Sequence, residues 1–158
     1  MISFLCGMEE KSGSPFVQKV RVRVCGLLME EGRIWLVRHE GLGQLGYFWS
    51  PPGGGVEFGE TVEETLKREF LEETGLEVEC IRFVTFHEHI DSRFHALELF
   101  FEVRKVAGVA VLGSDPELAD REAMMTDLRL FGREELSSMP DEAVHSCVVP
   151  FLSDGAGF

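Results

Sequence analysis

The sequence lacks closely spaced cysteines, and this absence disfavours a zinc site. Structural zinc sites place cysteine or histidine ligands a few residues apart, as in C-x-x-C. The four cysteines here are widely spaced along the chain, at Cys6, Cys25, Cys80 and Cys147. Scattered cysteines of this kind are typical of free thiols in a reducing cytosol.

Basic residues are also scarce. The 158 residues include 15 Lys and Arg against 28 Asp and Glu, which gives a formal net charge of −13 at pH 7. Because a nucleic-acid backbone is bound through basic patches, this balance argues against a nucleic-acid polymer as a partner. Small phosphorylated ligands are not excluded, since a divalent metal ion can reverse the local sign of charge.

Long apolar runs are missing as well. No run approaches the ~20 residues that a membrane helix needs. The start, MISFLCGMEEKSGSP, lacks the basic region and long apolar stretch of a signal peptide. We therefore expect a cytoplasmic protein with no membrane partner. With 44% hydrophobic residues and no linker or repeat, the chain predicts a single domain over residues 16–158 after a loose leader over residues 1–15.

Strand and helix signals are mixed along the chain. The predicted strands are KVRVRVCGLLM, RIWLVRH, LEVECIRFVTFHEHI, HALELFFEVRKV and LRLF, and the first two form a hairpin around EEG. EGLGQLGYFWSPPGGG is predicted as a glycine-rich loop around a short aromatic strand, LGSDPELADREAMMTD as an acidic loop, and REELSSM and EAVHSCVVPFL as helices. This mixture predicts an α/β layered fold.

One further helix has signals at both ends. Thr61, with Glu64 three residues later, matches a capping box, and Gly75 is suited to end a helix, so the pattern predicts a helix over residues 62–74. Apolar residues spaced four apart form a stripe along it, namely Val62, Leu66 and Phe70. We expect this stripe to pack inward against the sheet.

Three glutamates of this helix converge. Glu69, Glu72 and Glu73 stand at i, i+3 and i+4, so their side chains are neighbours on the helix surface. The plain alternative is a solvated acidic face, but Glu69 and Glu73 point towards the side that the apolar stripe must bury. A buried carboxylate is costly unless it is paired or bound to a metal. Hard carboxylate oxygens on a rigid helix suit Mg²⁺ or Mn²⁺.

The glycine-rich loop and this helix together resemble the Nudix box, G-x5-E-x7-R-E-U-x-E-E-x-G-U, in which U is a bulky apolar residue. All nine fixed positions match: Gly54, Glu60, Arg68, Glu69, Phe70, Glu72, Glu73, Gly75 and Leu76. The resemblance extends over about residues 20–136 through the order of strands. It implies a Nudix-type α/β/α sandwich with a mixed β-sheet.

The resemblance also implies an activity. Nudix hydrolases cleave the pyrophosphate linkage of a nucleoside diphosphate joined to another group, by attack of water on phosphorus with divalent metal ions. The metal ligands it implies are Glu69, Glu72, Glu73 and the carbonyl of Gly53. By the same resemblance, Arg68 orients the catalytic glutamates and Glu60 supports the loop and the metal shell.

Some assignments stay open. The general base is a glutamate of the box or a later carboxylate, and the later candidates are Glu98, Glu117 and Glu122. We predict Arg38 and Gly54 as substrate-binding residues. Phe48 and Trp49 either stack on a base or belong to the core. No motif separates nucleoside triphosphates, nucleotide sugars, ADP-ribose and dinucleoside polyphosphates as substrates.

The alternative function is that of a non-catalytic Nudix-fold module that binds a nucleotide as a sensor. Such modules often lose box carboxylates, whereas this chain keeps all of them. A related isomerase of isoprenoid diphosphates would need a catalytic cysteine and a longer chain. The number of metal ions is open, and so is a homodimer, which is frequent in the family.

Overall fold

The computed structural model describes residues 19–90, 94–113 and 124–148. The elements in chain order are β1 (Val20–Glu30), β2 (Arg33–Glu40), β3 (Tyr47–Ser50), β4 (Gly53–Gly55), α1 (Val62–Thr74), β5 (Leu76–Ile90), β6 (His95–Gly108), β7 (Met124–Phe131), α2 (Arg133–Ser137) and the 3₁₀ turns η2 (Asp141–Ala143) and η3 (Ser146–Val148). The leader predicted over residues 1–15 lies outside the described residues. The single domain over residues 16–158 stays a prediction.

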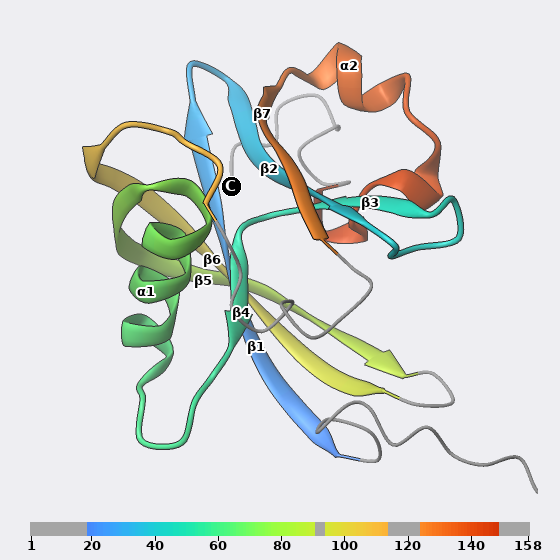
Figure 1. The fold of residues 1–158 in the computed structure, drawn as a ribbon. Helices are drawn as coiled ribbons and strands as arrows, with labels where there is room; N and C mark the ends of the chain where they lie inside the picture. Colours follow the sequence, from blue (N-terminus) through green and yellow to red (C-terminus); the bar gives the residue numbers. More distant parts are fainter. Residues whose placement is uncertain (1–18, 91–93, 114–123, 149–158) are drawn as a thin grey trace, which may run out of the picture.

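The described strands form one seven-stranded mixed sheet. Its order is β3-β2-β1-β6-β5, with β4 paired to β1 and β7 paired to β2. β1 and β6 run parallel, and the other pairs are antiparallel. β1 and β2 pair only beside their turn, at Met29↔Ile34 and Glu30↔Arg33. The sheet therefore opens into two halves, one of β4, β1, β6 and β5 and the other of β3, β2 and β7 (Figure 1).

Helix α1 covers one face of the half-sheet that contains β1 (Figure 1). Leu66 and Phe70 of α1 are fully buried there, and Val62 packs against the same cluster partly buried. They meet Val24 and Leu28 of β1. The predicted inward packing of the apolar stripe is confirmed.

The opposite face of β1 packs on the other half of the sheet. Cys25 and Leu27 lie in one cluster with Trp49 of β3 and Leu136 of α2. Because neighbouring residues of a strand point to opposite faces, the alternation along β1 serves both clusters. Helices thus lie on both sides of a mixed sheet, and the predicted α/β/α sandwich is confirmed (Figure 1).

Both ends of α1 form as its sequence predicts. The Thr61 hydroxyl accepts from the backbone N–H of Glu64 at 3.2 Å, and the Glu64 carboxylate accepts from the backbone N–H of Thr61 at 2.8 Å. Gly75 ends the helix at φ 67°, in the left-handed region that glycine adopts without strain. The loop before the helix and the strand after it are therefore held at defined points.

The other elements differ from the sequence prediction in three places. The triple glycine of β4 pairs with β1 as a strand, although glycine is depleted from strands. Strand β7 begins at Met124 rather than at Leu128, because residues 124–127 pair with β2. The helix predicted over residues 142–152 is wrong within the described part, where Val144 bridges to Trp49 and only the 3₁₀ turns are helical.

Candidate active site

The acidic run of α1 divides into buried and exposed glutamates. Glu69 and Glu73 are each only 1% exposed. Glu63 and Glu64, nearer the start of the helix, are exposed, and Glu72 lies between these extremes. A solvated acidic face would leave all five in water, so the burial of Glu69 and Glu73 needs compensation by hydrogen bonds or positive charge.

Arg68 supplies part of this compensation. Its guanidinium binds Glu60 through two hydrogen bonds of 2.8 and 2.9 Å, and it also reaches Glu69 at 2.9 Å and Glu72 at 3.4 Å. The hydrogen bonds from Arg68 and then from Thr65 lower the pKa of Glu60 to about 2. The pKa of Arg68 is raised in turn, chiefly by its hydrogen bond with Glu60. One guanidinium therefore orients three box carboxylates.

The glycine-rich strand β4 lies directly against the buried carboxylates. The backbone N–H of Gly53 donates to Glu73 Oε2 at 2.9 Å, and its carbonyl accepts from Arg23 Nη2 at 3.2 Å. A Cβ atom on Gly54 would overlap the Glu69 carboxylate, so only glycine lets the chain pass at this distance. The Glu69 carboxylate occupies the room that a side chain at residue 54 would need.

Arg38 lies at the hairpin of β2 and β3. Its guanidinium pairs with Glu40 at 2.8 Å and lies 4.7 Å from the centre of the Tyr47 ring. These contacts hold it beside the hairpin, and its predicted role in substrate binding stays a prediction. Trp49 is 5% exposed and packs edge-to-face on Phe131 at 4.7 Å, which confirms the core interpretation for this residue.

Glu98 is the one later candidate for the general base within the described residues, since Glu117 and Glu122 lie outside them. Burial raises the pKa of Glu98, but four effects outweigh it and lower the pKa to about 2: the hydrogen bond from His145, the charge of that ring when it is protonated, the charge of Arg23 and the hydrogen bond from His87. An efficient general base has a pKa near the working pH. Glu98 is therefore better suited to hold its neighbours than to take a proton.

Two residues beside this site were missed by sequence reasoning. Arg23 contacts both Gly53 and Glu98. The alternation of Val and Arg in VRVRV of β1 could have indicated that its arginines share one face of the strand. His145 reaches Glu98 from the segment between η2 and η3, which the sequence pattern predicted as a helix. No pattern in the sequence connects His145 with Glu98, which is 47 positions earlier.

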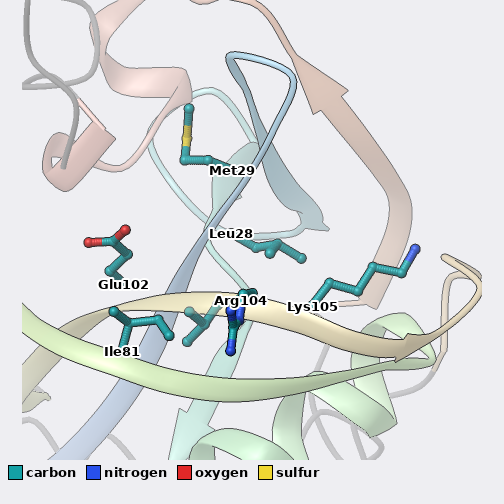
Figure 2. Close-up of a pocket in the computed structure, with 7 residues that line it drawn as sticks. Leu28, Met29, Ile81, Glu102, Arg104 and Lys105 are labelled. Carbon is teal, nitrogen blue, oxygen red and sulfur yellow. The ribbon is translucent and has the colours of Figure 1, made fainter.

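Two open pockets lie on the described surface. One of about 450 Å³ lies among β1, β5 and β6, and Figure 2 shows its lining side chains, none of which belongs to the box. The second, of about 590 Å³, lies beside the box loop, which is the segment of residues 56–61 between β4 and α1. Arg21, Gly55, Glu57 and Phe58 help to line it. The second pocket thus shares residues with the box segment, but none of Glu60, Glu69, Glu72 and Glu73 lines either pocket.

Comparison with known proteins agrees with this geometry. The family model described as NUDIX domain matches residues 17–150. An ADP-ribose pyrophosphatase of Methanocaldococcus jannaschii is 35% identical over 101 residues, which cover 63% of this chain and 59% of that protein. The chain thus spans less than two-thirds of the length of this curated relative.

Solved structures share the fold. A MutT NUDIX hydrolase of Burkholderia pseudomallei superimposes with a TM-score of 0.65 at 21% identity, over 88% of this chain and 100% of that one. A NUDIX hydrolase of Nitrosomonas europaea superimposes with a TM-score of 0.68 at 18% identity, over 85% of this chain and 86% of that one. At these identities the likeness establishes the fold alone.

Proposed function

Because this chain belongs to the Nudix family, we propose that it is a metal-dependent pyrophosphohydrolase. It hydrolyses the pyrophosphate linkage of a nucleoside diphosphate that is joined to a second group. The burial of Glu69 and Glu73 on the box helix, 1% exposed each, is the observation that carries this proposal. Burying two carboxylates beside a third destabilises the fold unless positive charge or hydrogen bonds compensate them.

The metal site of this proposal consists of Glu69, Glu72, Glu73 and the carbonyl of Gly53. The donor set fits Mg²⁺, with Mn²⁺ as the alternative, because every ligand atom is a hard oxygen. The Glu69 carboxylate lies in the position that a Cβ of residue 54 would take, so the glycine lets this carboxylate pack against the strand that carries the Gly53 carbonyl. When bound there, the cation supplies positive charge to the phosphate oxygens as a Lewis acid.

The remaining roles belong to the chain itself. Arg68 holds the glutamates in place through its contacts with Glu60, Glu69 and Glu72. Glu60 acts through Arg68, since its carboxylate receives two hydrogen bonds from that guanidinium. Gly54 admits the substrate close to the backbone. The candidates for the general base stay a glutamate of the box, Glu98, Glu117 and Glu122, and the low pKa of Glu98 argues against that residue.

ADP-ribose is the first substrate to test. The Methanocaldococcus jannaschii relative, which is 35% identical to this chain over 101 residues, is named an ADP-ribose pyrophosphatase. Nucleotide sugars, nucleoside triphosphates and dinucleoside polyphosphates belong in the same panel, since all contain the linkage. No described helix is long and apolar enough to span a membrane. A cytoplasmic location and a homodimer stay predictions.

The test is a panel of these compounds with the purified protein in Mg²⁺ or Mn²⁺, read by chromatography of the products. Hydrolysis of ADP-ribose at its pyrophosphate linkage releases AMP and ribose 5-phosphate. We expect a chelator to abolish turnover and added Mg²⁺ to restore it. Full activity in the chelator would refute metal dependence, and tight binding without turnover of any compound would favour the sensor function.

A further inference from the structure

A second polar cluster lies on the sheet face opposite α1, close to the box loop. His87 of β5, Glu98 of β6 and Arg23 of β1 are aligned across three neighbouring strands, since Glu98 is the register partner of both other residues. Directly paired residues project to the same face of a sheet. His145, between η2 and η3, reaches the same carboxylate from above this face.

Glu98 is the centre of the cluster. Its Oε2 atom lies 2.9 Å from His145 Nε2 and 3.2 Å from His87 Nδ1, and its Oε1 atom lies 3.5 Å from Arg23 Nε. The Glu98 and His145 side chains are only 15% and 9% exposed. A nearly buried carboxylate that contacts two histidine nitrogens and pairs with a guanidinium is ionised and acts only as an acceptor.

The hydrogen bonding of His145 Nδ1 argues against a metal ion in this cluster. The ligand atoms of His87, Glu98 and His145 lie within 4.8 Å of one another, which is a spacing that a metal could occupy. The backbone N–H of Cys147, however, donates to His145 Nδ1 at 3.1 Å. Nδ1 therefore carries no proton. A histidine that binds a metal through Nε2 carries its proton on Nδ1 and donates it to a neighbour. In His145, Nδ1 accepts a hydrogen bond instead.

The proton positions follow from these contacts. With Nδ1 of His145 accepting, its single proton is on Nε2 and is donated to Glu98. Because the carboxylate accepts only, His87 donates from Nδ1, which leaves its Nε2 atom unprotonated in the neutral ring. The two histidines thus have opposite tautomers, and both are set by one carboxylate and one backbone N–H.

The cluster connects to the box through Arg23. Arg23 pairs with Glu98 and donates from Nη2 to the Gly53 carbonyl, and the N–H of the same glycine donates to Glu73. We propose that His145 is a positioning residue of the active site, which acts through Glu98 to hold Arg23 against the Gly53 carbonyl. The proposal rests on the proposed function, because it concerns catalysis by the box.

Loss of the His145 donor has a defined consequence. Glu98 would keep the hydrogen bond from His87 and the ion pair with Arg23, and its carboxylate could rotate towards His87, which would release Arg23 from its position beside Gly53. Small displacements in a site can cost on the order of a hundredfold in rate. We expect His145→Phe, which keeps an aromatic ring beside Phe48 and Phe100, to lower kcat/KM at least about tenfold. His145→Gln, which restores a donor, recovers most of this loss.

A double-mutant cycle separates positioning from packing. In the Arg23→Met background, the further change His145→Phe should alter kcat/KM by no more than about twofold, because the residue it acts through is gone. The matched control is His95→Phe, since His95 forms a comparable pair with Glu88 at 2.9 Å on the exposed surface, and this variant should keep full activity. Additive losses at Arg23 and His145, or an equal loss at His95, would overturn the proposal.

A spectroscopic test does not depend on turnover. Long-range ¹H–¹⁵N NMR of the intact protein reports ring tautomers, and we expect Nε2–H for His145 and Nδ1–H for His87. Addition of equimolar Zn²⁺ should leave the His145 signals unchanged. An Nδ1–H tautomer at His145, or displacement of its Nε2 proton by Zn²⁺, would overturn the proposal even if the enzyme were active. Expected tautomers without any hydrolysis would instead contradict the proposed function.

Discussion

Replacing Glu73 by Gln separates a metal ligand from an ordinary buried residue. Glutamine keeps the shape of the side chain but removes one negative charge from a carboxylate that is 1% exposed. If Glu73 binds the metal, the loss of a charged group that stabilises the transition state is worth about 3–4 kcal/mol. Each ~1.4 kcal/mol is tenfold in rate, so turnover should fall by roughly two to three orders of magnitude.

The same change should affect folding much less. The Gly53 N–H now donates to a charged oxygen at 2.9 Å, and the amide would convert this bond to a neutral one. The difference is about 1 kcal/mol, partly offset because a buried charge is removed. For a domain of this size that corresponds to about 2–4 °C in Tm. The measurement is kcat under saturating Mg²⁺ together with thermal unfolding of the metal-free protein.

The matched control is Glu63→Gln on the same helix. Glu63 is more than half exposed and pairs with Lys67 at 2.8 Å on the helix surface, where water screens the interaction. Its replacement should leave turnover unchanged. Similar losses at Glu63 and Glu73, or no loss at Glu73, would refute the assignment of the buried glutamates to the metal.

Three further predictions test the local physics. Gly54→Ala should destabilise the fold by about 1–3 kcal/mol and reduce turnover, because its Cβ would overlap the Glu69 carboxylate; urea unfolding measures the first effect, and unchanged stability would contradict the overlap. Thr61→Ala should cost about 1 kcal/mol through loss of the helix cap, with Thr61→Ser as control, and equal melting temperatures would contradict it. Burial, and then the charge of Arg23, lower the pKa of His39 from 6.5 to about 4. Between these pH values the unfolded chain therefore binds a proton at His39 that the folded chain does not bind. The free energy of unfolding should fall as the pH drops from 6.5 to 4, and His39→Gln should flatten that part of the curve; an equally steep curve for the variant would contradict the prediction.

Much of the box was predictable because its signals are local. Thr61, Glu64 and Gly75 interact with backbone groups a few residues away, so the ends of α1 follow from the sequence order alone. The burial of Glu69 was predictable for the same reason, because an angle of about 100° per residue places it towards the apolar stripe. The Nudix resemblance added roles that the helical pattern could not supply.

Elements that depend on distant partners were not predictable in the same way. The triple glycine has low strand propensity, yet it forms β4 because β1 offers it backbone partners. The residues 142–148 have an apolar pattern suited to a helix, but pairing of Val144 and His145 with Trp49 competes with helical hydrogen bonds. Local propensity is a weak preference that a strand edge nearby can outweigh.

The sequence by itself determined the box helix, its caps, its buried glutamates and the family to which the chain belongs. Only the tertiary structure decided that Arg23 lies against Gly53, and that His145 meets Glu98 across 47 positions of chain. The physical reason is that a helix brings residues three and four apart together by its own geometry. Contacts between strands, and contacts of the segment that carries His145 with the sheet, form only once the order and register of the strands are established.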